Sequence, residues 1–522
     1  MLSLLFSGKS HFDNNNRNNS TSVTESENAI DESSSYELSN EDEVGLISSI
    51  SPSSSLSFGE NGSISISIPP ENSRIGGGPT SPDISPGPAI SPSQSVSPII
   101  NKQINDEKSK ESDVIVSPLT KEIPSVLSVS EMKDTLIRSR VSSFSKSPHW
   151  PSKADQELLE ARIQIANAPI IGNHPILHAP IYRNLSSFVR SYQIMEEMLK
   201  IYIYKDGKKP VFHKPRLKGI YASEGWFMKL LEESKQFVTN DPLQAHLFYL
   251  PFSSQLLVDY VYVPDSHSFH EINVYLKNYL DAIKGRYLFW NRTDGMDHFL
   301  VACHDWAPIE TRKLMANCIR ALCNSDIKEG FRLGNDVSLP ETKVPSPQKP
   351  LAKIGGAPPS DRKILAFFAG KMHGYLRPIL LKYWENKDPD MKIFGRLKKD
   401  SYAWHMKNSK YCICAKGYEV NSPRVVEALV NGCVPVILSD NFVPPFFEIL
   451  DWESFAVFVL EKDIPNLKNI LVSISESRYV EMQRRVTQVR QHFLWHSTPL
   501  KYDLFHMVLH SIWYNRVMRL SA

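Results

Sequence analysis

"GYEVNSPRVVEALVNGCVPVILS", residues 417–439, is the stretch that decides the fold. A polar loop opens it, a short helical pattern follows, and a run of β-forming residues closes it. The strand-forming residues "KYCICA", 410–415, come directly before it, so the whole reads as strand, loop, helix and strand. Such a βαβ crossover places its loop at the carboxyl end of a parallel strand, where open α/β sheets bind ligands.

Two interpretations fit the start of this helix. Ser422 is a natural cap and Pro423 fits the first turn, so the free N–H groups and Arg424 would attract phosphate oxygens. Glu427 lies one turn further on the same face, where its carboxylate would accept hydrogen bonds from ribose hydroxyls. The simpler interpretation is an i,i+3 surface ion pair, and the spacing alone favours it.

The rest of the ordered chain repeats the alternation of strands and helices that predicts an open α/β sheet. We predict strands at 199–207, 245–252, 286–292, 363–370, 410–415, 433–439 and 455–460. We predict helices at 155–168, 223–234 (with Ser223 as its cap), 272–283, 377–387, 401–409, 424–432 and 479–493. A Pro- and Gly-rich segment at 341–361 interrupts the pattern and indicates a linker or a long loop. Two similar α/β domains, residues 151–345 and 346–522, would therefore face each other across a cleft.

Residues 1–150 have a different composition. Serine, asparagine and acidic residues dominate, and such a segment buries too little apolar surface to offset chain entropy. We predict a disordered spacer or a regulatory tail phosphorylated at its Ser-Pro pairs, which include Ser51-Pro52, Ser81-Pro82, Ser85-Pro86, Ser91-Pro92 and Ser97-Pro98.

Composition excludes some classes of protein. Lys+Arg 59 against Asp+Glu 57 leaves a net charge of +2, and without a basic block we expect no nucleic-acid partner. The apolar start "MLSLLFSG" is far shorter than the roughly 20 residues of a membrane span. The six cysteines lack zinc-site spacing. We expect small buried thiols, with one or two disulfides as the alternative in an oxidising lumen.

Several blocks together resemble a known family. "KIYIYKDGKKPVFH", "TNDPLQAHLFYLPFS", "YLFWNRTDGMDHFLVACHDWAP", "ILAFFAGKMHGYLRP" and the opening stretch occur in the order seen in plant exostosin-family glycosyltransferases, glycosyltransferase family 47. The resemblance covers roughly residues 185 to 520. It looks closest to the plant subgroup that contains a xylogalacturonan xylosyltransferase.

The resemblance implies a GT-B-like fold and an inverting hexosyl- or pentosyltransferase that moves a sugar from a UDP-sugar to a cell-wall polysaccharide, pectin or hemicellulose. It places the donor on the second domain. Arg424 and Glu427 then fall on the donor motif, with Gly417 and Ser422 in the same loop. Arg377, in "HGYLRP", is a further donor-site candidate.

The catalytic base should come from the first domain. "GMDHFLVACHDW" offers Asp297, His298, His304 and Asp305, and we predict Asp297 or His298. GT-B enzymes stabilise the leaving diphosphate with helix dipoles and cationic side chains, so we expect no metal and no cofactor. Asp388-Pro389-Asp390 matches the metal-binding D-x-D pattern, but its position predicts a turn between a helix and a strand.

Family resemblance also predicts a single-pass type II Golgi membrane protein with a signal-anchor, other Golgi glycosyltransferases as partners, and a role in cell-wall biogenesis. The anchor is not visible in this sequence. Sequons at Asn184 and Asn291 are compatible with a luminal glycoprotein. Two alternatives stay open: an inert sugar- or nucleotide-binding partner in a polysaccharide synthase complex, and a cytosolic nucleotide-sugar enzyme.

Overall fold

The computed structural model describes residues 126–141, 148–348, 350 and 354–520. These residues belong to one compact unit, which contains both sheets. The predicted disordered stem, apart from its last residues, lies outside the described part of the chain.

The first sheet has six parallel strands in the order β2-β1-β3-β4-β5-β6. They are β1 (Ile201–Ile203), β2 (Val238–Thr239), β3 (Leu247–Tyr249), β4 (His298–Ala302), β5 (Ile319–Leu322) and β6 (Val337–Ser338). Every residue of β3 to β6 is buried, as expected of strands that helices cover on both faces.

The second sheet has five parallel strands in the order β11-β10-β9-β7-β8. They are β7 (Ile364–Ala369), β8 (Met391–Phe394), β9 (Ser409–Ala415), β10 (Val434–Leu438) and β11 (Val457–Phe458). Counted within each sheet, the first five strands of both follow the order 2-1-3-4-5 of doubly wound folds. The predicted α/β class with two Rossmann-like halves is therefore confirmed.

Helices surround and connect these strands. They are α1 (Val129–Val141), α2 (Lys153–Ala166), α3 (Leu185–Met198), α4 (Ala222–Glu232), α5 (Ser254–Val261), α6 (His270–Arg286), α7 (Phe289–Thr293), α8 (Ala307–Thr311), α9 (Leu376–Trp384), α10 (Lys399–Asn408), α11 (Arg424–Val430), α12 (Leu467–Val472), α13 (Glu476–Val489) and α14 (Leu504–Met518).

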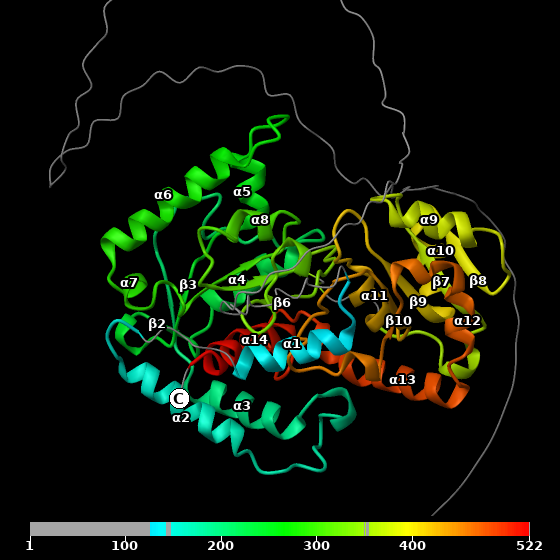
Figure 1. Cartoon of the computed structure of the whole chain (residues 1–522), viewed down its shortest axis with the longest axis horizontal. Helices are drawn as coiled ribbons and strands as arrows, with labels where there is room; N and C mark the ends of the chain where they lie inside the picture. The colour runs from blue at the N-terminus through cyan, green and yellow to red at the C-terminus, as the bar shows by residue number, and fades with distance from the viewer. Residues whose placement is uncertain (1–125, 142–147, 349, 351–353, 521–522) are drawn as a thin grey trace, which may run out of the picture. The chain divides into compact units, whose positions relative to one another are not determined.

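Helix α14 connects the end of the chain to the first sheet. Residues 504–517 are all buried, and the helix packs against α2, α3, α4, β5 and β6 (Figure 1). The predicted boundary near residue 345 separates the two sheets, but this last helix lies with the first of them. The first half is thus built from both ends of the described chain.

Three local predictions were wrong. Residues 286–292 do not form a strand: most of them lie in α7, which ends at Asp294 in the left-handed region. Ser223 is not a cap, because α4 begins at Ala222 and the Ser223 hydroxyl donates to the Pro340 carbonyl at 2.7 Å. Order also begins before Trp150, since α1 buries Met132 and Leu136.

Four of the six cysteines form disulfides, which the sequence analysis gave as the alternative to buried thiols. Cys303–Cys323 and Cys412–Cys433 are disulfides, while Cys318 and Cys414 are free and buried. The expectation of buried thiols therefore holds only for the last two. Each disulfide links neighbouring parallel strands, β4 to β5 and β9 to β10.

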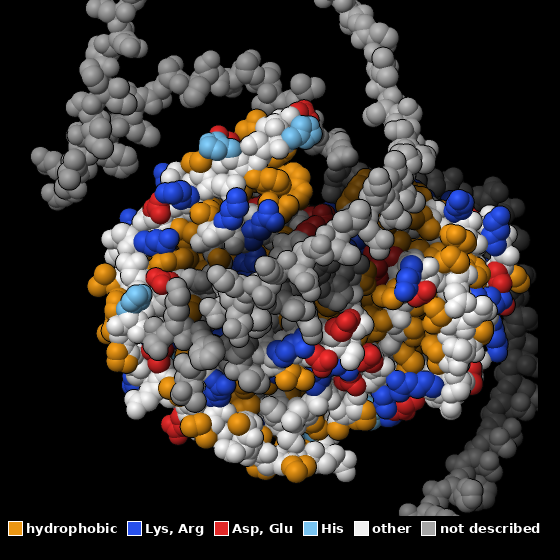
Figure 2. All heavy atoms as spheres, viewed as in Figure 1, with side chains coloured by type: hydrophobic (Ala, Val, Ile, Leu, Met, Phe, Trp, Pro, Cys, Tyr) orange, Lys and Arg blue, Asp and Glu red, His pale blue; other side chains and the backbone are white. Residues whose placement is uncertain are grey.

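The surface carries mixed charge. On the face in Figure 2, blue Lys and Arg side chains lie among red Asp and Glu side chains. Among the described helices, none is both long and apolar enough to cross a bilayer.

Candidate functional site

Two arginines connect the ends of β7 and β9. Arg424, the first residue of α11, donates from Nε and Nη2 to the Ala369 carbonyl at the end of β7, at 3.1 and 3.0 Å. Arg377, on α9, donates from Nη1 to Lys371 at 3.0 Å and from Nη2 to Ala415 at the end of β9, at 3.4 Å. The chain leaves β7 and β9 in opposite directions, so this is the switch point at which doubly wound sheets bind ligands.

Glycines leave room for the two guanidinium groups. A Cβ on Gly370 would lie 2.3 Å from Arg424 Nη2, and a Cβ on Gly417 would lie 3.0 Å from Arg377 Nη2. Gly374 has φ +69°, and a Cβ there would lie 2.0 Å from the Gly417 carbonyl oxygen. Gly374 is thus required for the loops after β7 and β9 to approach each other, whereas Gly417, the predicted donor-loop residue, leaves room for the Arg377 guanidinium.

Ser422 and Glu427 support this arrangement. The Ser422 hydroxyl accepts hydrogen bonds from the backbone N of Arg424 at 3.4 Å and from Arg424 Nη1 at 3.2 Å. The N-cap position of α11 itself is occupied by Pro423. Glu427 accepts from the Tyr402 hydroxyl at 2.5 Å. Within the described chain Arg424 and Glu427 form no ion pair with each other, so the simpler interpretation of their spacing is wrong.

The first half brings Glu341 towards these arginines. Glu341 follows β6 and accepts from Asn421 Nδ2 at 2.8 Å. Burial and the charge of Asp305 raise the pKa of Glu341 to about 8, while Arg424 and Arg377 act in the opposite direction. The hydrogen bond from Asn421 therefore joins Glu341 to the loop after β9, which also carries Gly417 and Ser422.

Asp305 lies three residues beyond β4, at the same edge of the first sheet as Glu341. It is partly exposed. Burial raises its pKa to about 6, and a hydrogen bond with Tyr221 partly offsets that shift. A carboxylate with a pKa near neutrality is suited to general-base catalysis.

A second pair of carboxylates completes the acidic side. Asn324 Nδ2 donates to Glu329 Oε2, to Glu419 Oε2 and to the Asp305 carbonyl, each at 2.9 Å. Burial, followed by the charges of Glu329 and Asp305, raises the pKa of Glu419 to about 8. Glu419 belongs to the loop after β9, so residues of both halves meet here.

A network of hydrogen bonds fixes the segment that carries Asp305. Glu224 of α4 is fully buried and accepts from Ser253, from Ser254 at 2.5 Å and from the backbone N of Cys303 at 2.8 Å. The backbone N of His304 donates to Ser254 at 3.0 Å. The Cys303–Cys323 disulfide joins this segment to the one that carries Asn324.

The structure places the predicted bases Asp297 and His298 elsewhere. Both side chains are fully buried at the amino end of β4, whereas Asp305 lies beyond its carboxyl end. Burial alone would raise the pKa of Asp297, but the hydrogen bond from His298 and the charges of Arg516 and Arg292 lower it below its usual range. His298 also bonds the Tyr204 hydroxyl at 2.7 Å. This placement argues for a structural role of Asp297 and His298.

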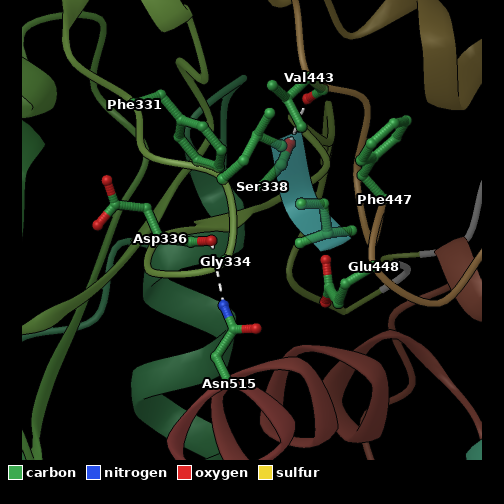
Figure 3. Close-up of a pocket in the computed structure, with 10 residues that line it drawn as sticks. Phe331, Gly334, Asp336, Ser338, Val443, Phe447, Glu448 and Asn515 are labelled. Atoms are coloured by element: carbon green, nitrogen blue, oxygen red, sulfur yellow. Dashed lines mark hydrogen bonds between the residues drawn. The ribbon is translucent and has the colours of Figure 1, made fainter. Parts of the chain in front are cut away.

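Two other regions are separate from this site. Asp388 and Asp390 lie in the turn before β8, as predicted, and both accept from Lys468, at 2.6 and 2.9 Å. A cavity of about 10 Å³ beneath α1 is lined by Ser338, Glu448 and Asn515 among others (Figure 3) and is far too small for a nucleotide. In the described chain no group of three or more His, Cys, Asp or Glu residues is arranged to hold a metal.

Sequence reasoning missed Glu341, Glu329 and Glu419 and did not select Asp305. The signal for Asp305 was its position just after a buried strand. Glu341 lay in the segment interpreted as a linker, and nothing in its neighbours predicts the contact with Asn421, 80 residues away.

Comparison with known proteins defines the class. The Exostosin GT47 domain matches residues 195–474, more than half of the chain. The chain belongs to this family of glycosyltransferases. A probable glycosyltransferase of Arabidopsis thaliana is 46% identical over 373 residues, 70% of this chain and 72% of that protein.

More distant relatives have more specific names. A probable beta-1,4-xylosyltransferase of A. thaliana is 29% identical over 341 residues, 60% of this chain and 81% of that protein. A probable glucuronosyltransferase of Oryza sativa subsp. japonica is 29% identical over 340 residues, 60% of this chain and 80% of that protein. These names differ in the sugar, so the similarity alone does not select the donor.

Proposed function

We propose that the protein is an inverting glycosyltransferase that moves a sugar from a UDP-sugar to a cell-wall polysaccharide. One observation carries the proposal: two arginines lie at the switch point of the second sheet, and the loop after β9 is hydrogen-bonded to Glu341 and Asn324 of the first half. A cationic anchor for a diphosphate and an acidic partner for a hydroxyl therefore lie together.

Donor binding uses the second half. Arg377 and Arg424 would bind the diphosphate oxygens, because a guanidinium matches them in charge and geometry. Both are held by backbone carbonyls, so little side-chain entropy is lost on binding. Glu427, oriented by Tyr402, would accept from the ribose hydroxyls.

Transfer requires a base on the opposite side. Asp305 takes the proton of the acceptor hydroxyl, and the hydroxyl oxygen forms a bond to the anomeric carbon. The bond from that carbon to the diphosphate oxygen breaks, and its electron pair leaves with UDP. The arginines stabilise the charge that develops there. Attack from the face opposite UDP inverts the anomeric centre without a metal ion.

We place this reaction in the Golgi lumen. The two disulfides support this location, because disulfides persist in oxidising compartments and are rare in the cytosol. A type II membrane protein acting beside other Golgi glycosyltransferases would match this environment.

UDP release tests the proposal. The full-length chain is offered UDP-sugars with and without wall oligosaccharides, and acceptor-stimulated release from one donor is expected in the presence of chelator. Asp305→Asn should abolish turnover but keep UDP binding, whereas Glu427→Ala should weaken UDP binding. Glu160→Gln, on the exposed face of α2, is the control. UDP binding without turnover of any donor would favour the inert synthase partner instead.

A further inference from the structure

A basic segment of the first half follows β1. It spans residues 205–218 and has the sequence "KDGKKPVFHKPRLK". Six of these residues are Lys or Arg and one is Asp, whereas the whole chain carries a net charge of only +2. Proline and apolar residues interrupt the segment, so no long run of basic residues marks it in the sequence. Positive charge is therefore concentrated in one loop of a chain that is nearly neutral as a whole.

The lysines of this segment have no counter-charge within the described chain. The acid inside the segment, Asp206, pairs with Arg286, and Arg216 pairs with Asp259 at 2.5 Å. Five lysines remain, all exposed and none in an ion pair or a side-chain hydrogen bond with another described residue: Lys205, Lys208, Lys209, Lys214 and Lys218. Such a cluster of unpaired charge attracts a ligand with several negative groups.

Backbone contacts hold the segment on the first half. The backbone N of Ser253 donates to the Val211 carbonyl at 2.9 Å, and Val211 itself is buried. Trp226 Nε1 donates to the Leu217 carbonyl at 3.1 Å. Because the loop is held in this way, a ligand that binds its lysines does not have to order the backbone first.

The segment leads to the proposed base. Gly219, directly after it, pairs with Val344 in an antiparallel bridge, and Tyr221 pairs with Thr342 in a parallel one. The Tyr221 side chain is hydrogen-bonded with Asp305. The last lysine of the segment is therefore close in the chain to the residue that contacts the base.

The topology of the sheet places the segment and the base at the same edge. Strands β1, β3 and β4 are parallel neighbours, so the loops that follow them leave the sheet on one side. The loop after β1 is the basic segment, and the loop after β4 carries Asp305. A polymer that offers a hydroxyl to Asp305 can therefore lie along this edge with its other residues on the lysines.

We propose that the acceptor is an acidic polysaccharide, which binds the lysines of residues 205–218 through its carboxylates while one of its hydroxyls lies at Asp305. This rests on the proposed function and narrows it, because it selects a polymer of uronic acids over a neutral hemicellulose. Each exposed ion pair contributes little, but several pairs along one polymer act together. The lysines take no part in the transfer step, so they determine the affinity for the acceptor and not kcat.

Matched acceptors test the inference with the full-length protein. Oligogalacturonides and their fully methyl-esterified forms share one backbone, but the ester carries no charge. Calorimetry in the absence of donor should show that the free acid binds roughly tenfold more tightly than the ester, or better. Added salt should weaken the binding of the free acid alone, because it screens exposed charges. Equal affinity for the two forms overturns the inference.

Two double variants locate the effect. Lys214→Gln/Lys218→Gln should weaken binding of the free acid roughly two- to thirtyfold, as expected for two exposed ion pairs, and should leave UDP affinity unchanged. The matched control is Lys235→Gln/Lys313→Gln, which removes two exposed lysines from the connections into β2 and β5, at the opposite edge of the sheet. It should bind the free acid as the wild type does, and equal affinity of the two double variants overturns the inference.

Two further outcomes are decisive. Single-stranded DNA of the same charge that binds as tightly as the oligogalacturonide overturns the inference, because the segment then binds polyanions of any kind. UDP binding and transfer separate this inference from the proposed function. A wild-type chain that binds no UDP refutes the proposed function, and the inference falls with it. A chain that binds UDP and transfers to neutral acceptors as readily as to acidic ones loses only the inference.

Discussion

The protonation of Asp305 controls activity if it is the base. Only the deprotonated carboxylate accepts a proton, so kcat/KM should be full above its pKa of about 6 and should fall as the pH drops through that value. The hydrogen bond with Tyr221 lowers this pKa, so Tyr221→Phe should move the acid limb to higher pH.

A pH–rate profile of both proteins checks this prediction. Tyr260→Phe is the matched control, because Tyr260 is 61% exposed on α5. A limb that stays in place in Tyr221→Phe would argue that another group titrates.

Arg424 should determine donor affinity through its shape as well as its charge. Arg424→Ala should weaken UDP binding by roughly 10- to 100-fold, the equivalent of about 1.5–3 kcal/mol for a hydrogen bond to a charged group. Arg424→Lys should restore little of it, because an ammonium lacks the planar fork with which the guanidinium donates to the Ala369 carbonyl and to the Ser422 hydroxyl. Calorimetry with UDP measures both variants, and Arg478→Ala, on the exposed face of α13, should bind as the wild type does.

Individual residues also show which parts of the candidate site local sequence patterns can predict and which they cannot. The opening stretch predicted the place of Arg424, Ser422 and Gly417, because a βαβ unit fixes its own loop. It did not predict Asn324 with Glu419, since those residues are 95 positions apart and come from different sheets. Their contact depends on how the two halves pack, which local patterns do not encode.

At the scale of elements, Asp155 joins three helices. Its carboxylate accepts from Arg292 of α7 and from Arg516 of α14, at 3.0 Å for the latter, while Asp155 itself lies on α2. Asp155→Asn should cost about 3–5 kcal/mol, because it leaves buried arginines partly unpaired. Urea unfolding measures the loss of stability. An unchanged UDP affinity would show that Asp155 stabilises the fold and does not take part in donor binding.

The Cys303–Cys323 disulfide should stabilise the edge that carries Asp305. It closes a loop with a sequence separation of 20, for which chain entropy predicts about 3 kcal/mol. Changing both cysteines to serine should lower the Tm and the turnover together. Reductant should lower the Tm of the wild type by a larger amount than that of the double variant, which keeps only Cys412–Cys433.

Elements differ in how well the sequence predicts them. The strands β7, β9 and β10 were predicted because long apolar runs between turn signals can hardly be anything else. Residues 286–292 also contain an apolar, aromatic run, but most of these residues lie in the helix α7 and not in a strand. Short apolar runs do not distinguish a strand from a single buried helical turn, so tertiary packing decided that case.

For the molecule as a whole, α14 predicts cooperative unfolding. It packs against the first sheet and against the 3₁₀ turn at Arg490–Phe493, which in turn contacts α11 of the second half. Calorimetry should therefore show one transition. Ile512→Ala, in the buried middle of α14, should lower the free energy of unfolding by about 2–5 kcal/mol and move the whole transition to lower temperature. Two resolved transitions, with only one of them shifted, would contradict this view.

The packing of α14 on the first sheet also determines when, during synthesis, the first half can finish folding. The first half cannot complete its core until α14, residues 504–518, has left the ribosome. Until then the surfaces of β5 and β6 that α14 covers stay open to chaperones and to wrong partners. A stop codon before or within α14 should therefore prevent folding of the first half, and should not merely yield a shorter functional protein.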